Sequence, residues 1–71
     1  MTETFSHREF EITLDKEDDH YFCRIHHIEG RPFVVGRGVS REWQTLRFGN
    51  KQTAIDEARA IAESATMDTH R

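Results

Sequence analysis

The chain has 71 residues, of which 35% are hydrophobic and 32% are charged, and its formal net charge is −3. A chain of this length forms one small domain with a modest core, and its aromatic content of 10% excludes disorder throughout. The single cysteine excludes an internal disulfide, and no apolar run reaches the ~18 residues of a membrane span. We therefore expect a soluble cytoplasmic protein with no membrane partner.

The charge is distributed unevenly along the sequence. Residues 1–19 carry seven acids and two bases, which gives a net charge of −5. Residues 20–51 carry six bases and two acids, for +4, and residues 52–71 contribute −2. This asymmetry is informative about partners rather than about the fold.

The first strand is predicted over Arg8–Leu14, where polar and apolar residues alternate as in a half-buried strand. Its apolar positions are Phe10, Ile12 and Leu14. Residues 1–7 lack a pattern and are expected to be flexible. The charged run at 15–19 predicts a solvated loop, because a calcium loop would need alternating ligands and an obligatory glycine.

The second and third strands are predicted over His20–Glu29 and Phe33–Ser40, joined by a turn at 30–32. One face of the second strand carries Tyr21, Cys23, Ile25 and His27, and the other carries Phe22, Arg24, His26 and Ile28. In the third strand, Gly36 and Gly38 indicate a bulge or a close approach of another backbone.

The fourth strand is predicted over Trp43–Phe48, with Leu46 facing the core, and a helix is predicted over Lys51–Ala65. Asn50 is a suitable N-cap, because its side-chain oxygen can accept from an amide in the first turn. The core-facing stripe of the helix spans ~120°. It consists of Ala54, Ile55, Ala58, Ile61, Ala62 and Ala65. The outward positions are Asp56, Arg59 and Glu63. Residues 67–71 are expected to be a flexible tail.

These elements predict an α+β fold, an antiparallel meander of three to four strands with one C-terminal helix packed on one face (β-β-β-β-α). The chain is expected to be a single small domain over 1–71, with an ordered core at about 8–66. Because most core-facing helix residues are alanines, the helix can approach the sheet closely and the sheet must supply the bulk of the core.

Histidines and the cysteine cluster in the second strand, at His20, Cys23, His26 and His27. Zinc needs three or four convergent ligands, but His20 and His26 lie ~20 Å apart along a strand and Cys23 points to the other face. Cys23 and His27 share a face ~13 Å apart, too far for the histidine to activate a thiol. No catalytic motif is present. We therefore expect no metal, no cofactor and no enzymatic activity.

The face of the sheet opposite the helix is the candidate binding surface. Its predicted binding residues are Phe22, Arg24, His26, Arg37, Trp43 and Arg47. Phe22, Ile28, Phe33 and Trp43 would form an apolar patch there. Aromatic and arginine side chains together suit a protein interface, and they also suit nucleic acid, where rings stack on bases and arginine meets phosphate. Alternatively, the first strand, the N-terminal tail or a second copy covers this face.

Three strands followed by Leu46-x-Phe48, capping Asn50, Ala54 and Ala62 resemble the three-strand-plus-helix DNA-binding domain of ethylene-response factors and of integrase arm-binding domains. The resemblance covers residues 33–62. It implies that the sheet lies in the major groove, with groove-facing Arg24, Arg37, Trp43 and Arg47. The chain departs from that family where Arg47 replaces a glycine before the phenylalanine and Gln52-Thr53 replaces an acidic pair.

The chain is also similar to short bacterial sheet-plus-helix proteins of uncharacterised function. The sequence thus supports two hypotheses. The first is a small non-catalytic interaction module that uses the open sheet face or a strand edge to bind a protein partner or to form a homodimer. The alternative is a nucleic-acid-binding domain that uses the basic, aromatic sheet face.

Overall fold

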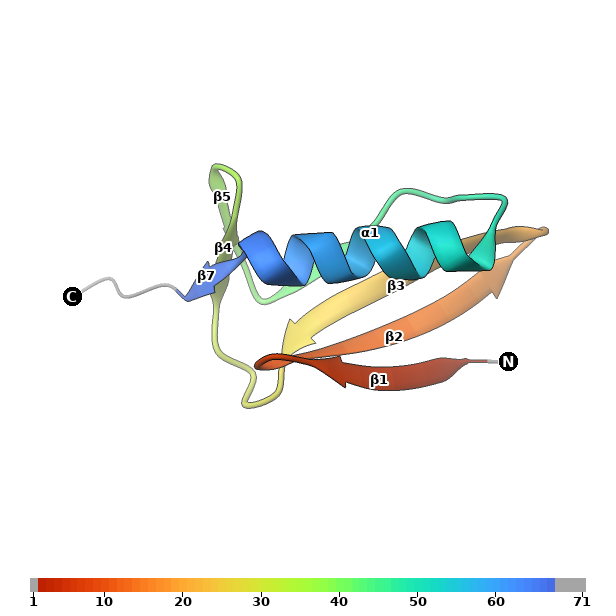
Figure 1. Ribbon diagram of the computed structural model, residues 1–71. Coiled ribbons are helices and arrows are strands. Elements are labelled where there is room, and N and C mark those ends of the chain that lie inside the picture. The colour runs from red at the N-terminus through yellow and green to blue at the C-terminus, as the bar shows by residue number, and fades with distance from the viewer. Residues whose placement is uncertain (1, 68–71) are drawn as a thin grey trace.

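The computed structural model describes residues 2–67. Of the tail predicted over 67–71, Met67 lies in a strand, which corrects the prediction there, and residues 68–71 lie outside the described residues. Within residues 2–67, seven strands form two antiparallel sheets, and one helix packs beside them (Figure 1). The larger sheet has the order β1-β2-β3-β6, from Glu3–His7, Phe10–Glu17, His20–His27 and Glu42–Gln44. The smaller sheet has the order β5-β4-β7, from Gly38–Ser40, Phe33–Val35 and Thr66–Met67. The predicted α+β class, with a meander and a C-terminal helix, is confirmed.

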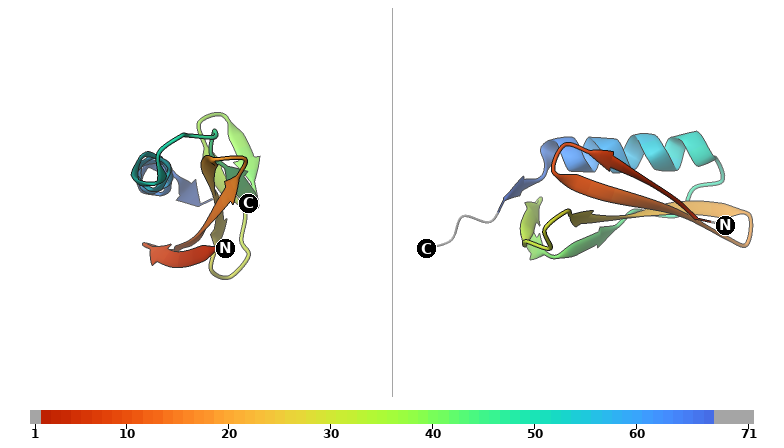
Figure 2. Two further views of the ribbon diagram at one scale, coloured as in Figure 1. Left: turned by 90° about the vertical axis from the view of Figure 1, so that its right-hand side faces the viewer. Right: turned by 90° about the horizontal axis from the view of Figure 1, so that it is seen from below.

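Helix α1 spans Lys51–Ser64 and covers one face of the larger sheet, and the smaller sheet lies at its C-terminal end (Figures 1 and 2). The Asn50 side chain accepts hydrogen bonds from the amides of Gln52 and Thr53, so the predicted N-cap is confirmed. None of the helices in residues 2–67 is long and apolar enough to cross a membrane.

The core lies between α1 and the larger sheet. It consists of Phe10, Ile12, Leu14, Cys23, Ile25, Phe33, Ala54, Ala58, Ala62 and Ala65. The alanines of the predicted stripe are buried, and Ile55 and Ile61 pack against the edge of this cluster. Small side chains on α1 and large ones on β2 and β3 thus fill a thin interior, as the sequence predicted.

The N-terminal strand is the first difference from the sequence prediction. Residues Glu3–His7 were expected to be flexible, but they form β1 and pair with β2 along its whole length. A short strand at the border of a sheet needs only one buried face, and Phe5 is its one large apolar residue. Such a segment has too little alternation for the pattern to reveal it.

The predicted loop at 15–19 is shorter than expected. Strand β2 runs to Glu17, and only Asp18 and Asp19 form the turn, with φ of 48° and 64°. Two residues with positive φ match the right-handed twist of the flanking strands, and aspartate tolerates this conformation better than most residues. The resulting hairpin is tight and pairs Glu17 with His20.

The predicted third strand over Phe33–Ser40 is two strands. Gly36 has a φ of +61° and begins a two-residue turn, so the chain reverses and β4 pairs with β5. The two glycines therefore mark a hairpin rather than a bulge. Strand β4 belongs to the smaller sheet, and Phe33 is buried in the core and not on the open face, which corrects its predicted position.

The predicted fourth strand ends early, at Gln44. Arg24 pairs with Gln44 and Tyr21 pairs with Phe48, so four steps along this segment match three steps along β3. This extra residue is a β-bulge, and it places Phe48 opposite Tyr21, on the core side. Before the bulge, Trp43 lies opposite Ile25, so the alternation along the segment turns Thr45 toward the core and Leu46 away from it. Thr45 is buried and Leu46 is 76% exposed, so the prediction that Leu46 lies in the core is wrong.

Candidate interaction surface

The face of the larger sheet opposite α1, here called the open face, is polar. It carries Thr4 and Ser6 on β1, Glu11, Thr13, Asp15 and Glu17 on β2, and Phe22, Arg24 and His26 on β3. These positions alternate with the buried residues that face α1. Within the described chain no second layer covers them (Figure 2).

Acidic side chains of β2 neutralise the bases that the sequence placed on this face. Arg24 lies 2.7 Å from the Asp15 carboxylate, and His26 lies 3.1 Å from that of Glu11. Arg47 follows β6 and pairs with Glu17 at 2.8 Å, while its guanidinium stacks 5.2 Å from the centre of the Phe22 ring. The open face therefore carries partly exposed ion pairs and is not a basic patch.

Four of the six predicted binding residues come together on this face: Phe22, Arg24, His26 and Arg47. Trp43 does not, because it is opposite Ile25 in the sheet register and packs on the α1 side against the core. Arg37 lies in the turn of the β4–β5 hairpin, in the smaller sheet. The predicted positions of Trp43 and Arg37 on the open face are thus wrong.

The acidic side chains of the open face were not among the predicted binding residues. The polar residues of the predicted first strand occupy every second position, and Glu11, Asp15 and Glu17 follow the same alternation. This alternation was the signal that could have assigned them to the open face. The ion pairs follow once β2 and β3 are paired across a two-residue turn. Their individual contribution to stability is small, about 0–1 kcal/mol for exposed pairs.

Cys23 is fully buried under α1. Its thiol donates to the carbonyl of Ala54 at 3.5 Å, and its amide donates to the Thr45 hydroxyl at 2.9 Å. Burial, with a smaller contribution from Asp15, raises the pKa of the thiol to about 11. A protonated, enclosed thiol is a packing group and not a nucleophile.

His27 is also buried at the helix side of the sheet. Its Nδ1 accepts from the amide of Glu29 at 3.1 Å, and its ring meets Phe10 edge to face at 5.8 Å. The other two histidines of β3 lie apart from it, His26 on the open face and His20 next to the turn at Asp18 and Asp19. Among residues 2–67, no group of three or more His, Cys, Asp or Glu side chains could hold a metal ion.

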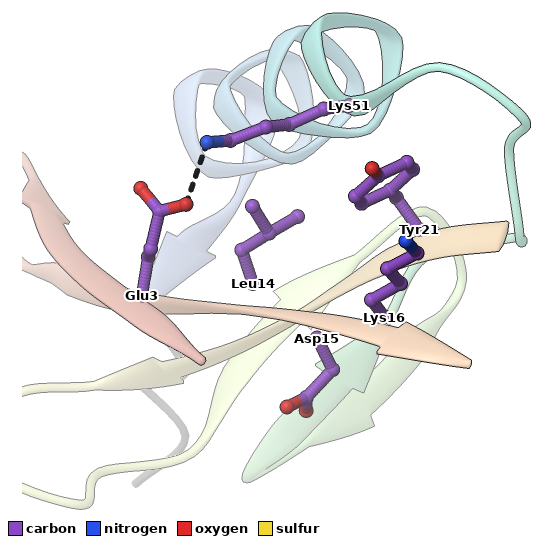
Figure 3. Close-up of a pocket in the computed structure, with 6 residues that line it drawn as sticks. All are labelled: Glu3, Leu14, Asp15, Lys16, Tyr21 and Lys51. Carbon is purple, nitrogen blue, oxygen red and sulfur yellow. Dashed lines mark ion pairs between the residues drawn. The ribbon is translucent and has the colours of Figure 1, made fainter. Parts of the chain in front are cut away.

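A pocket of about 190 Å³ lies where the start of α1 crosses β1, β2 and β3 (Figure 3). Its lining residues are Glu3, Leu14, Asp15, Lys16, Tyr21 and Lys51. The Lys51 ammonium lies 2.6 Å from the Glu3 carboxylate, and this hydrogen bond raises the pKa of Lys51. Figure 3 shows Asp15 pointing away from α1 while Glu3 and Lys51 reach toward each other. The pocket is a gap beside a β1–α1 ion pair.

Hydrogen-bond alternation fixes which backbone groups point out of the larger sheet. In antiparallel pairs, every second residue of a strand bonds to one neighbour and the others face the opposite way. His7 and Phe10 flank a two-residue turn and bond to each other, as do Glu17 and His20. Phe5 and Glu3 lie two and four residues before His7, so their backbone groups also point toward β2. The amides and carbonyls of the two residues between them, Thr4 and Ser6, therefore point away from β2.

The other border of the larger sheet is shorter and partly blocked. Strand β6 has three residues. The Thr45 amide donates to the Cys23 carbonyl, so the pair two residues further along, Ile25 and Trp43, is also a hydrogen-bonded pair. Glu42 and Gln44 therefore point outward. The Ser40 hydroxyl donates to the Glu42 carbonyl and accepts from its amide at 3.3 Å, which leaves Gln44 alone at this edge.

Comparison with known proteins gives no relative: no family model, no curated protein and no solved structure matches the chain.

Proposed function

We propose that this protein is a small non-catalytic interaction module that binds a protein partner or a second copy through the larger sheet. The observation that carries the proposal is that both outer strands of the sheet, β1 and β6, lack an outer neighbour among residues 2–67. An edge of unpaired amides and carbonyls is a template for another strand. The edge is favoured over the open face, because the open face is occupied by its own ion pairs.

Photo-crosslinking from defined positions tests this function. A benzophenone amino acid would be placed at Ser6 on the β1 edge, at Phe22 on the open face, and at Gln52 on the exposed surface of α1 as the matched control. In cells that make the protein, we expect adducts from Ser6 at least several-fold above those from Gln52. Equal, background yields at all three positions would contradict an interaction role for this sheet.

Nucleic-acid binding is the alternative proposal, and one observation favours it. Arg31, Arg37 and Arg41 are exposed around the smaller sheet, and none of them is in an ion pair within the described part of the chain. These arginines, rather than the paired Arg24 and Arg47, would meet phosphates. The overall charge of −3 opposes the approach of a polyanion.

Titration with mixed duplex DNA and with single strands distinguishes the alternative. Binding through phosphates must weaken as salt rises, and Arg37→Gln should reduce both the affinity and its dependence on salt. Arg47→Gln is the matched control, because Arg47 is already held by Glu17. Absence of binding at ~50 mM salt would end this alternative.

A further inference from the structure

We propose that the β1 edge pairs with the β1 edge of a second copy, antiparallel and centred on Phe5, to join two larger sheets into one. This inference rests on the proposed function and names its partner. Strand β1 is the longer of the two borders of the larger sheet, with five residues against three in β6. It has no lysine, no proline and no bulge, which are three of the devices that block edge pairing.

The direction of the backbone groups limits the possible registers. Thr4 and Ser6 present outward amides and carbonyls, so a second β1 must bring its own Thr4 or Ser6 opposite them. Centring the pair on Phe5 places Thr4 opposite Ser6 of the second copy and Ser6 opposite Thr4, so both outward residues of each strand bond. The two Phe5 residues then form the close, non-hydrogen-bonded pair at the twofold axis.

Side-chain complementarity favours the same register. Centring on Phe5 places Glu3 opposite His7 of the second copy, and the twofold axis repeats this acid–base pair. Centring on Thr4 would instead place Glu3 opposite Phe5, and centring on Ser6 would place Phe5 opposite His7. Opposite-charge and aromatic pairs stabilise antiparallel neighbours. The register with the most overlap is therefore also the one with complementary side chains.

The surroundings of β1 extend this complementarity. Within one copy, Glu3 binds Lys51 at 2.6 Å and His7 binds Glu63 at 2.8 Å, both on α1. Pairing centred on Phe5 would connect these into one row of polar side chains: Lys51, Glu3, then His7 and Glu63 of the second copy. The Arg59 guanidinium lies 5.6 Å from the centre of the Phe5 ring and covers it from the helix side.

The space beside β1 admits a second copy. Helix α1 packs mainly over β3 and reaches β1 only through long side chains, and β1 forms the outer border of the fold (Figures 1 and 2). On the open face, the side chains at this border are those of Thr4 and Ser6, which are small and uncharged. A second copy would meet no covering segment of the larger sheet beside β1 among the described residues.

Sedimentation equilibrium combined with amide exchange on the natural chain tests the pairing. At about 1 mM protein, even a millimolar affinity leaves much of the chain in dimers. We expect the average mass to rise from 8.4 kDa toward twice that value. The amides of Thr4 and Ser6 should become several-fold more protected as concentration rises, while that of Phe5, already bonded to β2, should not. A constant mass of 8.4 kDa at this concentration would overturn the inference.

Proline substitutions locate the interface. Thr4→Pro and Ser6→Pro remove outward amides without breaking the β1–β2 ladder, and each should weaken association at least tenfold. Val39→Pro is the matched control, because Val39 also points outward, on the exposed strand β5. Dimers abolished only by Val39→Pro, or dimers without protection at Thr4 and Ser6, would overturn the β1 pairing and leave the proposed function intact. If the β1 variants unfold, the exchange data on the natural chain decide.

Discussion

The two faces of the larger sheet are held by different kinds of interaction. On the α1 side, Phe10, Ile12 and Ile25 are at most 2% exposed and pack against alanines. On the open side, Asp15, Glu17 and their basic partners form ion pairs that remain partly exposed to water. Burial of a large apolar side chain stabilises by roughly 1.5–3 kcal/mol, whereas an exposed ion pair contributes about 0–1 kcal/mol. One face therefore determines stability, and the other presents polar side chains to water without a second layer.

The largest expected contrast between the faces is that of two phenylalanines. Phe10→Ala should lower the free energy of unfolding by about 3–5 kcal/mol, because Phe10 is 2% exposed and contacts His27 and Phe33. Phe22→Ala, on the open face beneath Arg47, should cost no more than about 1–2 kcal/mol. Urea denaturation followed by circular dichroism measures both. Equal losses would contradict the division between the faces.

A smaller contrast is expected on α1. Ala58 is fully buried against the sheet, so Ala58→Leu should overpack the thin core and cost about 1–3 kcal/mol. Ala60 is exposed on the same helix, and Ala60→Leu keeps a strong helix former there, so its effect should stay within about 0.5 kcal/mol. Thermal unfolding of the two variants compares the same substitution on the two sides of one helix. A stabilising effect of Ala58→Leu would mean that the interior has spare volume.

The smallest effect is expected for the ion pairs of the open face. Glu17→Gln removes the partner of Arg47 and should change stability by less than about 1 kcal/mol. The difference from the natural chain should shrink further in ~1 M salt, where charges are screened within ~3 Å. A loss that exceeds that of Ala58→Leu, or that persists in high salt, would show that the open face has a structural role.

The sequence predicted the helix well and the later strands poorly, for a physical reason. The cap at Asn50 and the alanine stripe are local features, read from neighbours three or four residues apart. The positions of Phe33, Trp43 and Leu46 depend instead on which sheet β4 joins and on the register in which β6 pairs with β3. Because strand side chains alternate, a shift of one residue in register moves every side chain of a strand to the opposite face.

The same distinction holds for the candidate surface. Phe22, Arg24 and His26 lie on the open face as expected, because the second strand is long and regular. Their neutralisation by Glu11 and Asp15 is a non-local consequence of pairing β2 with β3. Strand β1, which carries the proposed edge, has only Phe5 as a large apolar residue and gave no pattern at all.

The contact between the first strand and the only helix of the described chain bears on how the protein folds. His7 and Glu63 are 56 positions apart, and the Arg8 guanidinium donates to the Glu63 carbonyl at 2.8 Å. During synthesis, β1, β2 and β3 leave the ribosome before α1 does. The β1–β2–β3 hairpins can form early from local contacts, but their apolar face stays uncovered until α1 emerges. Long-range closure of this kind slows folding, so docking of α1 onto the sheet should be the late step.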